Sequence, residues 1–207
     1  AASDVYKRQL QASMGSFTAT ANYVRHGLVS PGKLWFAVFM TLLGAMTGAL
    51  LVQRLPNAWL ETLVPVMLII IALYFLFSKK IRLESGEQRI SLTAFSVLIG
   101  FTIGFYDGFF GPGTGSFFTI AFVLLLGYAL PQAIGGTKLL NFTSNVVALG
   151  VFILSGHILW LAGIVMGAGQ ILGSYLGSHM AIKHGGKLIR PMLVTISILM
   201  SIKLLLD

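Results

Sequence analysis

Runs of mostly apolar residues, each long enough to cross a bilayer as a helix, recur along this 207-residue chain and constrain its fold more than any other feature. A spanning helix needs about 20 such residues. The segments that qualify are Leu34–Val52, Leu60–Phe77, Ile90–Tyr106, Thr114–Leu130, Leu139–Leu154, Ile158–Met180 and Leu188–Leu206. A less apolar helix is expected over Gln9–Val24, whose small and hydroxyl residues suit packing against other helices. The sequence therefore predicts an all-α, polytopic transmembrane helical bundle.

The composition agrees with a protein that has lipid as its solvent. Only 10% of the residues are charged, whereas a soluble domain carries about 25%. The net charge is +8, but the basic residues lie mainly between the apolar runs, as the positive-inside rule predicts. No basic face is interleaved with exposed aromatic residues, so we expect membrane lipid and not nucleic acid as a partner. The chain has no cysteine, which excludes disulfides, thiolate metal sites and cysteine nucleophiles.

Three glycines recur at one constant offset, which indicates an internal duplication. They are Gly27, Gly44 and Gly48, which return 129 positions later (156−27, 173−44, 177−48) as Gly156, Gly173 and Gly177. The last two glycines of each copy form a Gly-x-x-x-Gly pair, a spacing that lets helix backbones approach closely. Chance is the alternative, because the chain has 24 glycines. We divide the chain into a first repeat, residues 1–89, and a second repeat, residues 90–207.

The basic loops predict how the two repeats are oriented. Arg25–Lys33, Lys79–Arg89 and Lys183–Arg190 should be cytoplasmic, and Arg54 should lie on the other side. The loop at Gly156-His157 has no Lys or Arg and should be outside, although its counterpart at Gly27 is inside. The repeats would then be inverted relative to each other, as in many secondary transporters.

The stretch Gly100–Phe118 contains the strongest local signal, a Gly-Pro-Gly-Thr-Gly turn at Gly111–Gly115 inside an apolar region. Pro112 and its flanking glycines break a helix. Such a break is tolerated at membrane depth only when it is buried in protein or lines a watery cavity. A helix that starts near Thr114 would point free amide groups and a positive dipole end at an anion. A plain extramembrane turn is the alternative; a phosphate-binding P-loop fits poorly, because no lysine precedes Ser116 and no strand precedes the turn.

Polar residues within the apolar segments are candidates for function. Asp107, directly after the segment Ile90–Tyr106, is the acidic candidate, with a helix cap or an interfacial position as the alternative. Lys138 is the matching cation, unless it snorkels to the interface. Asn141 and Asn145 share one helix face and could bind substrate or pair helices. No histidines have the spacing of metal ligands and no catalytic constellation is present, so we expect no metal, no cofactor and no enzyme activity.

The Gly-Pro-Gly-Thr-Gly turn, the segment Gly136–Asn145 (GTKLLNFTSN) and the Gly156-His157 turn together resemble the sulfite exporter TauE/SafE family, from about Leu10 to the end of the chain. The resemblance implies a bacterial inner-membrane protein associated with export of sulfite, sulfoacetate and related organosulfur anions. Members of that family usually begin with a first glycine-rich hairpin and an Asn-Lys-Leu-Gln-like motif. Here Leu10-Gln11 matches the end of that motif, with Gln9 in place of the lysine. We therefore expect a first repeat that lacks its hairpin, with residues 1–9 foreign to the family.

These features predict an ion-coupled transporter of a small anion, and the resemblance implies that the anion is a sulfur-containing oxyanion that is exported. The expected anion site consists of the Gly113, Thr114, Gly115 and Ser116 region with its backbone amides, Lys138 for charge, and Asn141 and Asn145 for orientation. Asp107 is the candidate for a coupling proton. A non-transporting membrane scaffold or assembly subunit and, less well supported, a membrane-embedded enzyme stay open as alternatives, as does a homo-oligomer.

Overall fold

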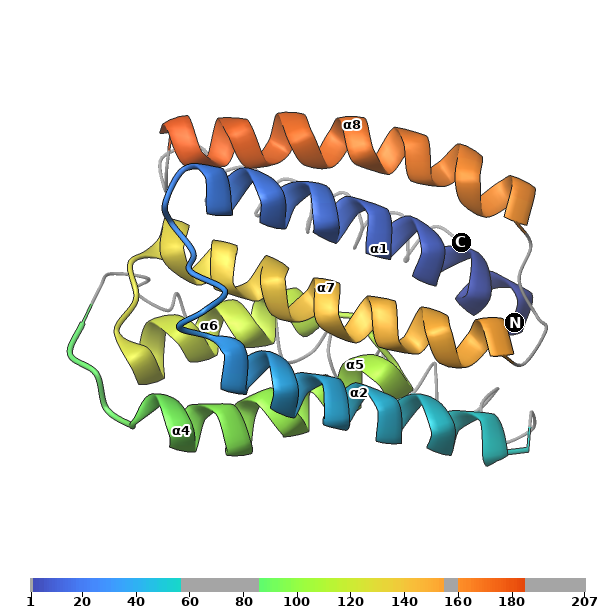
Figure 1. The fold of residues 1–207 in the computed structure, drawn as a ribbon, viewed down its shortest axis with the longest axis horizontal. Coiled ribbons are helices and arrows are strands. Elements are labelled where there is room, and N and C mark those ends of the chain that lie inside the picture. The colour runs from blue at the N-terminus through green and yellow to red at the C-terminus, as the bar shows by residue number, and fades with distance from the viewer. Residues whose placement is uncertain (1, 57–85, 155–159, 185–207) are drawn as a thin grey trace, which may run out of the picture.

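The fold is that of a computed structural model, which describes residues 2–56, 86–154 and 160–184. Every regular element in these residues is a helix, as predicted (Figure 1). The helices are α1 (Ala2–Arg25), α2 (Trp35–Arg54), α4 (Leu92–Phe95), the π-helical turn η1 (Ser96–Gly100), α5 (Phe101–Phe109), α6 (Thr114–Leu126), α7 (Leu130–Leu154) and α8 (Trp160–His184). The predicted helices Leu60–Phe77 and Leu188–Leu206 lie outside the described residues.

Three helical stretches in the described part of the chain are long and apolar enough to cross a membrane: Trp35–Arg54, Leu92–Phe109 and Leu130–Leu154. The shorter apolar helix α6 returns antiparallel to α5 (Figure 1). Large apolar side chains such as Trp35, Leu98 and Leu172 are each more than half exposed on the outside of the bundle. Lipid solvates such a surface, so both length and exposure indicate a multi-pass membrane protein.

Two helix starts differ most from the prediction, and two helix ends differ by four residues each, since α6 ends at Leu126 and α8 at His184. We expected a helix over Leu139–Leu154, but α7 begins at Leu130. Pro131 lies in its first turn, where a missing amide hydrogen costs nothing. The following pair, Gly135-Gly136, also lies inside the helix. A Cβ at Gly136 would lie 2.8 Å from the Phe122 ring, so only glycine allows α6 to pack closely there. α1 is also longer than the expected Gln9–Val24, since it begins at Ala2.

The two helices before the α5–α6 hairpin, α1 and α2, correspond to the two after it, α7 and α8, at the 129-residue offset seen in the glycines. Shifting α1 by 129 gives residues 131–154, which matches α7, and shifting α2 gives residues 164–183, which lies within α8. α1 packs on α8 as α7 packs on α2, and α1 and α7 run in opposite directions (Figure 1). Where they cross, Asn145 Nδ2 donates to Ser16 Oγ at 3.5 Å, a bond between residues 129 positions apart.

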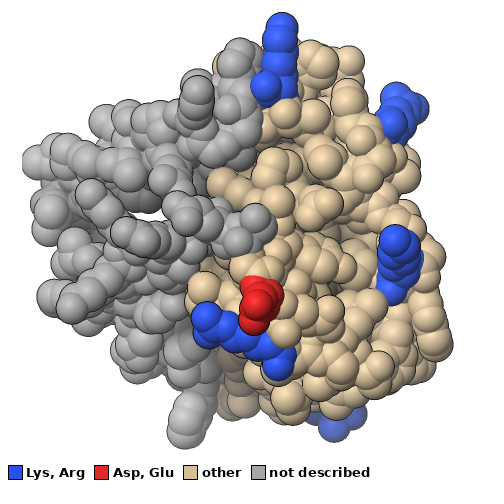
Figure 2. Space-filling model, turned by 90° about the vertical axis from the view of Figure 1, so that its left-hand side faces the viewer, with Lys and Arg blue, Asp and Glu red and all other residues tan. Residues whose placement is uncertain are grey.

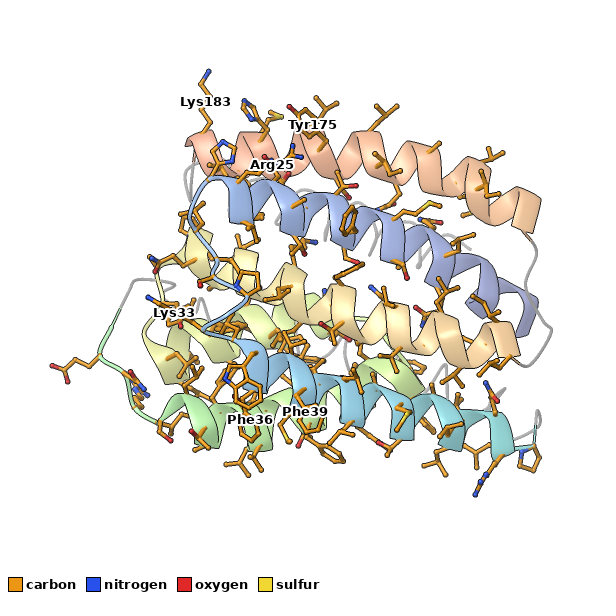
Figure 3. All side chains as sticks on the ribbon, in the orientation of Figure 1. Arg25, Lys33, Phe36, Phe39, Tyr175 and Lys183 are labelled. Atoms are coloured by element: carbon orange, nitrogen blue, oxygen red, sulfur yellow. The ribbon has the colours of Figure 1, made fainter. Side chains whose placement is uncertain are left out.

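Basic residues gather at one end of the bundle, which we call the basic end and define by Arg25, Lys33, Arg89 and Lys183. Arg25 ends α1, Lys33 precedes α2 and Lys183 lies in the last turn of α8, all at the same end (Figure 3). The Arg89 amide donates to the Leu125 carbonyl at 2.9 Å, which brings residues 86–90 to this end as well. Figure 2 looks onto the basic end and shows Lys and Arg side chains spread over its described part. Arg54 lies at the opposite end, where α2 terminates.

Candidate functional site at the broken helix

The break between α5 and α6 is a tight turn that only glycine fits well. Gly111 has φ +90° and Gly113 has φ +84°, a region that side chains with a Cβ rarely adopt. The Tyr106 hydroxyl donates to the Pro112 carbonyl at 2.6 Å and so ties the end of α5 to the turn. Sequence reasoning did not find this Tyr106 bond, because a tyrosine in an apolar helix can have many roles.

This turn lies beside the middle of α7 and not beside either end of that helix. A Cβ on Gly115 would lie 3.3 Å from Asn141 Nδ2, and Ser144 Oγ donates a hydrogen bond to Asp107 Oδ2. Asn141 and Ser144 are close to the midpoint of Leu130–Leu154, one of the candidate spans. A turn outside the membrane would instead face a helix end. The geometry therefore favours a helix broken at mid-height.

Asp107 is buried where three helices meet. Its carboxylate accepts from Ser144 of α7, and the Thr114 hydroxyl at the start of α6 lies beside it. In the part of the chain that the structure describes, its hydrogen-bonding partners are hydroxyl groups and not cations. Asp107 thus holds the hairpin against α7, whatever further role it has.

The first amides of α6, which we expect to face an anion, differ in whether they already have a backbone acceptor. The Thr114 amide donates to the Gly111 carbonyl at 3.3 Å, and the Ser116 amide donates to the Gly113 carbonyl at 2.9 Å. These short-range bonds tighten the first turn, as is common at helix termini. Only the Gly115 amide, of the three expected donors, has no backbone acceptor among the described residues.

A cavity of about 720 Å³ lies beside the turn, between α1, α6, α7 and α8. Four of the predicted site residues line it: Gly113, Gly115, Ser116 and Lys138. The remaining described residues of its wall are Ala19, Tyr23, Thr119, Ile120, Leu130, Ile134, Thr137, Gln170, Gly173, Ser174, Gly177, Ser178 and Ala181. Thr114, Asn141, Asn145 and Asp107 are not among the wall residues. The structure therefore brings together the turn and the lysine, and separates them from part of the predicted set.

The comparison with known proteins decides the family. The family model described as "Sulfite exporter TauE/SafE" matches residues 8–204 of this chain. This chain belongs to the TauE/SafE family. The match confirms the resemblance and includes nearly all of the segment on which it was based.

Relatives of this TauE/SafE chain are named as transporters. It is 45% identical over 199 residues to "Probable membrane transporter protein YfcA" of Escherichia coli K12, with 96% of this chain and 74% of the relative covered. It is 43% identical over 199 residues to "Probable membrane transporter protein" of Haemophilus influenzae, with 96% and 78% covered. Neither name describes an enzyme or states a substrate. No solved structure matches the chain.

The two asparagines of the TauE/SafE motif have different surroundings. Asn145 Nδ2 donates to Ser16 Oγ, so this side chain pairs α7 with α1. Asn141 lies beside Gly115, and its buried Oδ1 has no hydrogen-bond partner among the described residues. A buried carbonyl oxygen without a partner is costly. Asn141 therefore lies next to the cavity wall with a buried hydrogen-bond acceptor that is unsatisfied among the described residues.

Several wall residues of this TauE/SafE chain were missed by sequence analysis. Gln170, Ser174 and Ser178 follow one another at four-residue spacing on α8, so they share one helix face. That spacing is the same signal that singled out Asn141 and Asn145, and it could have found them. Gln170 Oε1 accepts from Gln11 Nε2 at 3.1 Å, which links α8 to α1.

Metal-ligating side chains do not cluster in the described part of the molecule. No three of its His, Cys, Asp or Glu residues are placed to hold one metal ion. His26 and His179 are neighbours, with ring centroids 6.3 Å apart. The other ring beside His179 is that of Tyr175, which adds no His, Cys, Asp or Glu ligand to the pair. The chemistry of the described site is therefore that of one lysine, one free backbone amide, the Gln170 carboxamide and several hydroxyl groups.

Proposed function

We propose that this protein exports a small sulfur-containing oxyanion across the bacterial inner membrane, in a cycle coupled to ion movement. The observation that supports this best is the juxtaposition in one cavity of Lys138, Ser116 and Gly115 with its free amide. A positive side chain, a hydroxyl and an unpaired amide at a helix start are the donors that an oxyanion needs. The family to which the chain belongs has sulfite export in its name.

Lys138 would supply positive charge, and the start of α6 would help to position the anion. Lys138 lies on α7, half-buried beside the turn. A cation removed from bulk water interacts more strongly with an anion than a surface lysine does, because the local dielectric constant is lower. The positive end of the α6 dipole adds to this attraction. Asn141 is not a wall residue, but its amide group lies directly beside Gly115, and it would orient an anion held at that residue.

Inverted repeats would provide the two sides of the transport cycle. The matching bounds of α1 with α7 and of α2 with α8, together with the opposite directions of α1 and α7, support such a relation. If the basic end is cytoplasmic, wall residues Tyr23, Leu130 and Ala181, near the ends of their helices, place the cavity on the cytoplasmic side of the turn. An anion for export would enter from there, attracted by the surrounding Lys and Arg residues.

Asp107 would carry the coupling proton. An ionisable residue buried at membrane depth is a functional candidate by default, and this one joins the broken helix to α7 through Ser144. Gain or loss of a proton would change the bond to Ser144 and with it the position of the turn. The scaffold alternative is less well supported, since the polar groups of α6 and α7 line a cavity and do not all pair helices.

The proposed site is tested by anion binding and flux in proteoliposomes with Lys138→Met. Loss of a hydrogen bond to a charged group costs about 1.5–3 kcal/mol, so binding of sulfite should weaken by roughly tenfold to hundredfold. Lys138→Arg should retain part of it. Lys183→Met is the matched control, because Lys183 is exposed on α8 and lines no part of the cavity. Unchanged sulfite binding by Lys138→Met would place the site elsewhere.

The proposed orientation is tested by labelling single cysteines from outside the cell. The chain has no cysteine of its own, so each variant carries one reporter. Arg54→Cys should react with an impermeant thiol reagent, whereas Lys33→Cys and Lys183→Cys should not. The sites Asn57, Lys80 and Gly156 would serve the same purpose but lie outside the described residues. Outside labelling of Lys33→Cys would contradict the inverted arrangement.

A further inference from the structure

We infer that the cavity selects an organic monoanion with an apolar body in preference to inorganic sulfite or sulfate. This inference rests on the proposed anion-transport function and narrows its substrate class. The first reason is size. A volume of about 720 Å³ would hold roughly two dozen water molecules at about 30 Å³ each, and it lies within the range of about 300–1,000 Å³ typical of sites for organic ligands. An oxyanion of four heavy atoms would leave most of it empty.

The charge of the wall is the second reason. Lys138 is the one charged residue among its described members, and no carboxylate is present. One buried cation can balance one negative charge, whereas a second negative charge would be left unpaired at high cost. A positive group on the substrate would find no carboxylate partner in the described wall. The site therefore favours a single negative charge and no other charge.

The third reason is the distribution of apolar side chains. Gly115, Ser116 and Lys138 lie at the turn, and Ile120, Leu130, Ile134 and Ala181 line the cavity between the turn and the basic end. A substrate whose anionic group is held at the turn would extend its body along these side chains. Burial of apolar substrate atoms there would contribute to affinity in proportion to the area removed from water.

Three hydroxyl groups of the wall, those of Thr119, Thr137 and Ser178, already have hydrogen-bond partners. Thr119 Oγ1 donates to the Gly115 carbonyl at 2.7 Å and lies 3.0 Å from Thr137 Oγ1. Ser178 Oγ accepts from Asn22 Nδ2 at 2.7 Å and donates to the Tyr175 carbonyl at 3.1 Å. A substrate body beside these three groups meets hydroxyls that are already bonded, which favours an apolar body at that part of the wall.

Titration calorimetry of the purified protein with five anions tests this inference: methanesulfonate, propanesulfonate, taurine, sulfite and sulfate. Each methylene buried should improve affinity by about fourfold, so propanesulfonate, with two more methylenes, should bind about fifteenfold more tightly than methanesulfonate. Taurine has an ammonium group where propanesulfonate has a methyl group, and it should bind at least about tenfold more weakly. Sulfate, with two charges, should bind most weakly.

Two isoleucines of α7 test whether the apolar body of the substrate binds along the cavity wall, one as the variant and the other as its control. Ile134→Ala should weaken propanesulfonate binding by several fold and leave methanesulfonate binding unchanged, because Ile134 lines the cavity away from the turn. Ile153→Ala, on the exposed outer side of the same helix, should change neither.

The outcomes separate this inference from the function on which it rests. If all five anions bind no better to the parent than to Lys138→Met, the proposed function fails. If they bind through Lys138 but sulfite or sulfate binds most tightly, or affinity does not rise with chain length, the proposed function stands and the substrate class inferred here is wrong.

Discussion

Two Gly-x-x-x-Gly pairs of this chain, Gly44 with Gly48 on α2 and Gly173 with Gly177 on α8, occur at equivalent positions and have opposite surroundings. On α2, a Cβ at Gly44 would collide with the Phe101 carbonyl oxygen, and a Cβ at Gly48 with that of Phe105, so the backbone of α5 lies directly against these glycines. On α8, Gly173 and Gly177 are exposed to the cavity, with nothing within 4 Å of a Cβ in the described part of the chain.

The difference shows what this motif specifies and what it leaves open. Glycines four residues apart remove the side chains from one helix face, which allows a close approach. They do not determine what approaches. On α2 the approaching group is the broken hairpin, which is thereby held firmly, and on α8 the same bare face forms one wall of the cavity.

Alanine substitutions should have effects of opposite sign in the two copies. Gly48→Ala forces its methyl group into the α5 backbone and should destabilise the protein by about 1–3 kcal/mol. Gly177→Ala meets open space and should be neutral or stabilising by up to about 1 kcal/mol, the usual preference of a helix for alanine. Thermal unfolding in detergent measures both. Equal destabilisation by the two variants would mean that α8 is as tightly packed as α2.

A large side chain on the open face should act on binding and not on stability. Gly177→Leu would fill part of the cavity, and we expect anion affinity to fall on the order of tenfold, the equivalent of about 1.4 kcal/mol. Gly169→Leu is the control, because Gly169 is exposed on the same helix but lines no part of the cavity. If both variants bind anions like the parent, the α8 wall does not face the substrate.

Sequence reasoning reached the helical architecture because apolar length is a strong and local signal. It also located the break, since Pro112 between Gly111 and Gly113 leaves few alternatives. It missed the first part of α7, because Pro131 and Gly135-Gly136 are usually features of loops. There the tertiary environment determines that the segment is helical, because the Phe122 ring packs against the helix at Gly136.

The candidate site was predicted less completely for a similar reason. Which amide of α6 is free depends on short-range bonds at the turn, and periodicity does not encode them. Asn141 and Asn145 share one face by spacing, but only the position of α1 decides that Asn145 pairs with Ser16. Which helix packs on which face follows from the assembled bundle and not from any one segment.

The firmly held hairpin is also where coupling is expected. Asp107→Asn keeps the shape of the side chain and should leave anion binding within about twofold of the parent, since Asp107 lines no part of the cavity. It should remove the dependence of flux on a proton gradient, because an amide cannot exchange a proton in this range. Flux into proteoliposomes with and without a pH difference measures this. A variant that responds to the gradient as the parent does would make Asp107 a structural link between α5 and α7.

The smallest expected effect tests whether the two copies are equivalent at the point where they meet. Ser16 and Asn145 occupy corresponding positions and bond to each other at 3.5 Å. Side-chain hydrogen bonds between membrane helices contribute about 0.6 kcal/mol on average, so Asn145→Ser alone should lower stability by about that amount. Exchange of the two residues, Ser16→Asn with Asn145→Ser, should restore it if a two-fold relation places both side chains in the same environment. Thermal unfolding of the two single variants and the double variant forms the complete cycle. A double variant no more stable than the less stable of the two single variants would mean that α1 and α7 meet without such symmetry. Their matching lengths would then have another cause.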